Sequence, residues 1–210
     1  MEPASPEQIQ ALWRAARRLR RRSRWAKAEL PPLWFFTDPQ RTPEPERVAE
    51  RLPAGSGLVF RAFGAPDAEA RGRRLAAIAR ARGLVLLVGA DASLAEAVAA
   101  DGVHLPQRLA RQGPRLKARR ADWIVTQAAH DARSLARAEQ HGVDAAFLST
   151  VAPSRSPSAE PNWPPWRVRR MVAGASLPVF GLGGVTTETA ASLRPAGLAG
   201  LAAVDAFLAR

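Results

Sequence analysis

The sequence contains no cysteine, so disulfide bonds and thiolate metal sites are excluded. No apolar run reaches the ~18 residues that a membrane-spanning helix needs. Residues 1–6 lack the apolar core of a secretory signal peptide. Together these absences predict a cytoplasmic protein that has no membrane partner.

What the sequence does contain is an alternation of short apolar runs with stretches of helical periodicity. Hydrophobic residues make up 47% of the 210 residues, which is enough for one well-packed domain. Such alternation implies parallel strands joined by right-handed crossovers, and the eight units found here favour closure into a (β/α)8 (TIM) barrel. The predicted strands are residues 33–37, 57–63, 84–88, 102–105, 123–128, 145–149, 177–182 and 200–204. The predicted helices between them are residues 44–52, 67–82, 93–100, 131–141, 165–173 and 187–193.

A further helix is predicted before the first strand, over residues 5–29. Ser5 suits the N-cap, Pro6 suits the first helical position, and Gln8 completes a capping box. A pair of prolines ends the helix. We therefore divide the chain into a basic N-terminal helix (residues 1–30) and a barrel (residues 31–210).

This N-terminal helix has no acidic residue between Arg14 and Lys27, where eight basic residues account for two thirds of the net charge of +12. Such a cluster can bind nucleic acid or an anionic membrane by charge neutralisation. However, Trp13 and Trp25 are its only aromatic residues. We therefore interpret it as the solvated face of a helix packed against the bottom of the barrel. We expect no nucleic-acid partner, and we expect the arginine-rich helix to be dispensable for any small-molecule activity.

Several predicted strand ends carry short motifs. Residues 34–38 read Trp-Phe-Phe-Thr-Asp, residues 101–105 read Asp-Gly-Val-His-Leu, and residues 179–185 end in Gly-Gly-Val. His130 follows the fifth predicted strand and precedes a Gly-Val-Asp at 142–144. In order and spacing, from about residue 33 to 208, these motifs resemble the superfamily of thiamine phosphate synthases and TenI-type thiazole tautomerases. The resemblance implies a barrel of thiamine biosynthesis that binds a small phosphorylated thiazole- or thiamine-like ligand.

The sequence departs from the synthases of this superfamily where they hold Mg²⁺ and pyrophosphate. Gly89, Ala90 and Leu109 stand at the positions of the metal loops, including both metal-binding aspartates, and Phe63 stands at the position of a pyrophosphate-binding lysine. Asp205 replaces a phosphate-binding serine. Because Mg²⁺ needs oxygen ligands close to the phosphates, we expect no metal and no other cofactor. The same departures argue against thiamine phosphate synthesis.

His130 is the candidate catalytic residue. The TenI-type tautomerases use a histidine at the end of strand five for proton transfer, and an imidazole that titrates near neutrality can take and return a proton at little cost. The alternative is a residue at the start of a helix that only bonds a loop. A proton-transfer role needs a partner that sets the tautomer, and the candidates are Gln127, Ser149 and Asp131.

The remaining candidate ligand-binding residues lie at or beyond the predicted strand ends or in the proline-rich segment after strand six. Each has a structural alternative: His104 as a satisfied core histidine, Arg61 as the ion-pair partner of Asp38, and the two glycines as relief from crowding in a tight turn. His141 is expected to be a surface residue at a helix end. The candidate ligand-binding residues are Arg61, His104, Gln127, Ser149, Ser154, Ser156, Gly183 and Gly184.

Three functions follow from this reading. The first is a metal-independent thiazole tautomerase, an isomerase in which His130 is the acid and base. The second is a divergent thiamine phosphate synthase, a transferase. The third is a barrel that binds a ligand or partner without catalysis. The sequence leaves open whether the chain forms a homo-oligomer.

Overall fold

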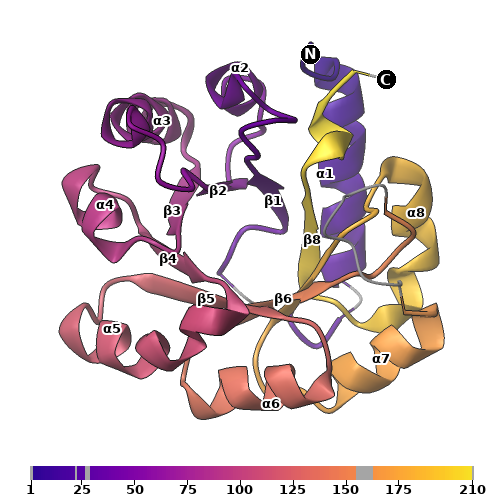
Figure 1. Ribbon diagram of the computed structural model, residues 1–210. Coiled ribbons are helices and arrows are strands. Elements are labelled where there is room, and N and C mark those ends of the chain that lie inside the picture. The colour runs from indigo at the N-terminus through magenta and orange to yellow at the C-terminus, as the bar shows by residue number, and fades with distance from the viewer. Residues whose placement is uncertain (1, 22, 27–28, 155–162, 210) are drawn as a thin grey trace.

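Eight parallel strands form a closed barrel in the computed structural model, which describes residues 2–21, 23–26, 29–154 and 163–209. Each strand pairs with the next along the chain, and β8 pairs with β1 (Figure 1). The strands are β1 (Leu33–Phe36), β2 (Gly57–Phe60), β3 (Val85–Gly89), β4 (Gly102–Leu105), β5 (Ile124–Ala129), β6 (Ala145–Ser149), β7 (Val179–Leu182) and β8 (Gly200–Ala203). The predicted TIM barrel is therefore confirmed, with every strand where the apolar runs indicated it.

Helices surround the barrel. They are α1 (Pro6–Arg21), α2 (Pro45–Ala49), α3 (Ala68–Arg82), α4 (Ala92–Ala97), α5 (Gly113–Arg119), α6 (Ala132–Gln140), α7 (Pro165–Ala173) and α8 (Thr187–Ser192), with 3₁₀ turns η1 (Gln107–Gln112), η2 (Arg194–Ala196) and η3 (Asp205–Phe207). Helix α5 was not predicted, because it buries only Gly113 and so has no apolar stripe. Among the described residues, no helix has the length and apolarity needed to cross a bilayer.

Several predicted boundaries are wrong: the helices predicted over residues 44–52 and 93–100, for example, end at Ala49 and Ala97. The strand predicted over residues 57–63 ends at Phe60, because a turn begins at Ala62, whose carbonyl accepts a hydrogen bond from Ala65 N. The helix predicted over residues 5–29 ends at Arg21. Beyond it, Ser23 Oγ donates to the carbonyl of Arg20, which ends the helix by offering its backbone another partner.

Helix α1 lies along the outside of the barrel, not against its bottom as predicted. It packs on β8, β1 and α8, and it lies between α8 and α2 in the ring of helices (Figure 1). Its buried face consists of Ile9, Leu12, Ala16 and Leu19, at helical spacing. In the described part of the chain, β8 is followed by the short turn η3, and α1 occupies the outer-layer position beside β8. The C-terminal end of α1 does reach the bottom of the barrel, where Arg20 Nε donates to the carbonyl of Ala199 at 2.8 Å.

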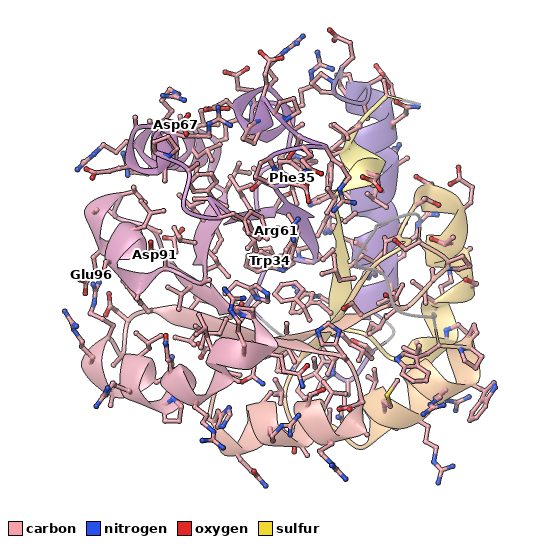
Figure 2. All side chains as sticks on the ribbon, in the orientation of Figure 1. Trp34, Phe35, Arg61, Asp67, Asp91 and Glu96 are labelled. Carbon is pink, nitrogen blue, oxygen red and sulfur yellow. The ribbon has the colours of Figure 1, made fainter. Side chains whose placement is uncertain are left out.

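Large aromatic side chains fill the lower part of the barrel, below the C-terminal ends of the strands. The ring of Phe147 lies 5.2 Å from that of Phe180 in a stacked arrangement, and Trp34 meets Phe147 edge-on at 5.5 Å. Trp34 and Arg61 lie toward the middle of the barrel, whereas Phe35 points to the outer layer, where it packs on Phe207 (Figure 2). This alternation follows from the two-residue period of a strand.

Gly57 makes room for the largest of these side chains. It is the register partner of Trp34 on the neighbouring strand, and a Cβ added at Gly57 would overlap the indole ring. Because the interior is close-packed, the indole has no free space into which it can move.

We expect Gly57→Ala to lower the free energy of unfolding by about 1–3 kcal/mol through overpacking. The measurement is urea denaturation of the variant and of the wild type. Gly174→Ala is the matched control, because Gly174 has right-handed helical geometry and an added Cβ would meet only ordinary contacts there. Equal stability of Gly57→Ala and Gly174→Ala would contradict this packing.

Candidate active site

The C-terminal ends of the strands open into a cavity of about 1420 Å³. This is the end of a TIM barrel at which active sites are found. Of the candidate catalytic and ligand-binding residues, those that line the cavity are Arg61, His104, His130, Ser149, Ser154, Gly183 and Gly184. Ser156 lies outside the described residues.

Gln127 does not line the cavity, so its assignment to the barrel mouth is wrong. On β5 the inward side chain is Thr126, which contacts His104, so Gln127 points to the outer layer. There its Oε1 atom lies 3.0 Å from His141 Nδ1, which places His141 behind β5 and away from the mouth. Gln127 directly follows the inward-facing Thr126 on β5, and neighbouring residues of a strand face opposite sides.

His130 lies at the junction between β5 and α6, where several hydrogen bonds fix its backbone. Its N–H donates to Ser134 Oγ at 2.9 Å, and its carbonyl accepts from Trp163 Nε1 at 3.2 Å. Asp131 is the N-cap of α6: Oδ1 accepts from Ser134 N at 2.6 Å, and this backbone hydrogen bond lowers the pKa of Asp131. Asp131 is therefore occupied by the helix cap.

Ser149 is the partner of the His130 ring. Its Oγ atom, at the end of β6, lies 3.1 Å from His130 Nδ1. Of the three partners considered from the sequence, Gln127 is bonded elsewhere and Asp131 caps a helix. The neighbouring strand end thus supplies the group that orients this imidazole.

His104 is a buried structural histidine, although one edge of it reaches the cavity. Its Nδ1 atom lies 3.0 Å from Thr126 Oγ1, and its ring meets Phe36 and Phe147 edge-on at 5.1 and 5.3 Å. Burial, and secondarily the positive charge of Arg61, lowers the pKa of His104 to about 3. This imidazole is therefore neutral at physiological pH.

Arg61 is held in a row of alternating charges along the β1, β2 and β8 side of the mouth. Its Nε donates to the carbonyl of Thr37 at 2.6 Å, and its Nη2 lies 3.3 Å from Asp38 Oδ2, so the ion-pair reading is confirmed. Asp38 also pairs with Arg41 at 3.0 Å, and Arg41 pairs with Asp205 at 3.2 Å. Burial lowers the pKa of Arg61 to about 10, against the opposing effect of Asp38. The charge of Asp205, which stands where the synthases have serine, is thus compensated by Arg41.

Gly183 and Gly184 meet a steric need. Their φ angles are 90° and 66°, values that favour glycine. A Cβ at Gly184 would overlap the carbonyls of Ala152 and Pro153, and one at Gly183 would lie 2.9 Å from Thr150 Cγ2. The segment after β6 thus passes directly over the glycine pair, as the crowding interpretation required.

The residues at the metal loops do not fit a magnesium site. Asp91 is the nearest carboxylate after β3, and it lies on the α4 side of the barrel (Figure 2). Its Oδ1 accepts from Leu94 N at 2.9 Å and caps α4. Leu109, on the β4 side, packs against the hydrophobic core. Within the described part of the chain, no three His, Cys, Asp or Glu side chains are grouped so that they could hold a metal ion.

Some residues of the cavity wall were missed in the sequence. Arg41 lies in a loop without a family motif. Ala4 and Gln8 also line the cavity, a contact that the sequence did not indicate. They reach it because Ala4 N donates to the carbonyl of Phe207 at 2.8 Å, which ties the N-terminal segment to η3. The resemblance begins near residue 33 and carried no signal for this contact.

Comparison with known proteins gives a consistent result. The profile of the family described as thiamine monophosphate synthase (TMP-TENI) matches residues 33–207. The thiamine-phosphate synthase of Geobacillus kaustophilus is 30% identical over 143 residues, which cover 67% of this chain and 64% of that protein. The chain thus spans slightly less than two thirds of that relative. The putative thiamine-phosphate synthase 2 of Aquifex aeolicus is 30% identical over 186 residues, which cover 86% of this chain and 99% of the relative.

A solved structure has the same architecture. Thiamine phosphate pyrophosphorylase from Pyrococcus furiosus superposes with a TM-score of 0.72 and 23% sequence identity, covering 84% of this chain and 86% of that one. At this identity the likeness shows a common fold.

The buried His104 makes a prediction for acid stability. Its folded-state pKa of about 3 is below the unfolded value of ~6.5, so the unfolded chain binds the extra proton as the pH falls through this window. Relative to His104→Gln, the wild type should therefore lose about 2 kcal/mol of unfolding free energy between pH 7 and pH 5. Urea denaturation at both pH values measures this. Parallel pH profiles of the two proteins would disprove the buried neutral state.

Proposed function

Because the chain belongs to the thiamine monophosphate synthase (TMP-TENI) family of thiamine biosynthesis, we propose that it is a metal-independent isomerase of a phosphorylated thiazole-type compound, a thiazole tautomerase. The observation that carries the proposal is the pairing of His130 with Ser149 at the wall of the mouth cavity. In this reaction His130 takes a proton from one atom of the ligand ring and returns it to another.

The chemistry of the pair suits a group that changes its protonation state. A serine hydroxyl donates as well as accepts hydrogen bonds. Ser149 therefore donates to Nδ1 when this atom is unprotonated and accepts from it when it is protonated. The imidazole ring therefore keeps its orientation both before and after it takes up a proton. A carboxylate partner only accepts hydrogen bonds, so it would favour the protonated ring over the neutral one.

The other two histidines are poorly suited to the role. His104 is buried, bonded to Thr126 and kept neutral by its surroundings. His141 is bonded to Gln127 behind β5. His130, by contrast, combines a fixed backbone, an oriented ring and a large adjoining cavity. The volume of about 1420 Å³ leaves ample room for a phosphorylated heteroaromatic molecule.

Arginines at the cavity wall support an anionic ligand. Arg41, Arg61 and Arg108 line the cavity, and the first two are oriented by Asp38. A phosphate or carboxylate can take bidentate hydrogen bonds from a guanidinium. Ser154 and the backbone of Gly183 and Gly184 face the same cavity and are further candidates for contact.

The divergent synthase is the weaker alternative. Synthesis of thiamine phosphate through a Mg²⁺–pyrophosphate complex needs carboxylates that Gly89, Ala90 and Leu109 do not supply, and Asp91 caps a helix. A non-catalytic binding barrel differs from the isomerase only in lacking turnover. Activity therefore decides between them.

Turnover of a thiazole carboxylate phosphate tautomer tests the proposal. We expect the wild type to be active and His130→Asn to lose about 10²–10⁴ in kcat, the range typical of a lost acid or base. Ser149→Ala should retain more activity than His130→Asn, because the imidazole remains but loses its fixed orientation. Circular dichroism of the variants checks that the barrel is intact.

His141→Asn is the matched control, since it removes an imidazole that lies outside the cavity. It should keep wild-type kcat. An inactive wild type, or a His130→Asn variant as active as the wild type, would refute the tautomerase and leave the binding barrel as the better description.

The absence of suitable carboxylates predicts that Mg²⁺ has no specific site. Isothermal titration of the protein with Mg²⁺, with and without pyrophosphate, should give no saturable binding, and EDTA should leave turnover unchanged. Saturable one-to-one binding coupled to formation of thiamine phosphate would instead identify the protein as a synthase.

A further inference from the structure

Phe63 adopts a backbone conformation that its residue type disfavours. It lies in a four-residue turn closed by the hydrogen bond from Ala65 N to the carbonyl of Ala62. The two central residues, Phe63 and Gly64, have φ angles of 49° and 77°. Positive φ at both positions is the signature of a type I′ turn, in which Gly, Asn and Asp predominate because a bulky side chain is strained there. Phenylalanine in this place costs folding free energy.

The side chain does not compensate for this cost by packing. It is 70% exposed, and the only ring contact of Phe63 within the described residues is with Arg61. Nothing crowds the turn either, because no atom would lie within 4 Å of a Cβ added at Gly64. A strained residue that folding does not require points to a function.

The position of the ring indicates what that function is. Phe63 lines the same cavity as His130 and Ser149, toward the solvent. The Arg61 guanidinium lies 5.4 Å from the Phe63 ring and 5.8 Å from the Phe36 ring. Arg61 is itself held by Thr37 and Asp38. A rigid cation with an aromatic plane on its solvent side therefore forms one wall of the mouth.

We propose that Phe63 is a stacking platform that makes the site selective for ligands with a planar heteroaromatic ring. This deepens the tautomerase proposal, on which the identity of the ligand ring rests. A phenyl ring carries no charge that would attract a diphosphate, and it offers a flat apolar surface on which a thiazole ring can stack.

The variants Phe63→Asn and Phe63→Trp test this platform. Asparagine suits the turn but has no ring, so Phe63→Asn should have a Tm at or above that of the wild type. We expect the same variant to bind a thiazole phosphate at least tenfold more weakly, while its affinity for inorganic phosphate changes less than twofold. Phe63→Trp should bind the thiazole phosphate as the wild type does. Isothermal titration measures the affinities.

Trp166→Ala is the matched control. Trp166 is a second exposed large hydrophobic residue among those that the structure describes, 64% exposed on α7, and it does not line the cavity. Its removal should leave both affinities unchanged. Equal thiazole phosphate affinity in Phe63→Asn and the wild type would overturn the platform, as would a parallel loss of inorganic phosphate binding or a wild type that binds no thiazole phosphate.

The outcome for the platform is separate from the outcome for catalysis. If the wild type binds the thiazole phosphate tightly, Phe63→Asn binds it weakly and neither turns over a tautomer, then the stacking platform stands and the isomerase fails. If the wild type is an active isomerase and Phe63→Asn matches it in KM, then the isomerase stands and the platform fails. With both correct, Phe63→Asn raises KM and leaves kcat within a few-fold.

Discussion

The aromatic packing inside the barrel, where Trp34, Phe147 and Phe180 meet, is the interaction on which the rest of the structure depends. A parallel barrel must fill its interior with side chains, and here the rings fill it at the lower end. The large cavity lies beyond this packing, at the C-terminal strand ends. The same packing extends to His104, whose ring meets Phe147 edge-on and stays neutral. The aromatic packing thereby keeps His104 from exchanging protons with a ligand at the mouth.

Salt bridges order the mouth on one side. Arg61, Asp38, Arg41 and Asp205 alternate in sign, so each charge has an opposite neighbour and the row as a whole is neutral. Guanidinium groups that are already oriented lose little side-chain entropy when an anion arrives. The row therefore supplies directed hydrogen-bond donors without a strong positive field around the opening.

Much of the fold was predictable from the sequence, because eight apolar runs alternate with helical stretches and a parallel sheet needs little else to be recognised. The position of His130 at a strand end was also predictable. Its partner was not, because choosing Ser149 over Asp131 requires knowing which carboxylate caps a helix. Gln127 could not be excluded in the same way, because its bond to His141 behind β5 is seen only in the folded barrel.

Other features had no sequence signal. Arg41 lies in the loop after β1, and Gln8 lies in α1, before the first family motif. Only tertiary packing brings the two residues to the cavity. The turn at Phe63 is misleading in the sequence, because an aromatic residue after a strand extends the apparent strand by three residues. Prediction from local sequence preferences fails at such strained residues, because the backbone conformation there is one that the residue type disfavours.

The position of helix α1 separates the order of the elements along the chain from their order around the barrel. It lies where a helix after β8 would lie, and the two ends of the chain run side by side, with Pro3 bridged to Leu208 in antiparallel fashion. The strand–helix units therefore continue around the whole barrel, with α1, the first helix of the chain, packed on β8, the last strand. A circular permutant that begins at β1 and carries α1 after β8 would retain every strand pairing. The order of the units along the gene is thus a separate property from their order around the barrel.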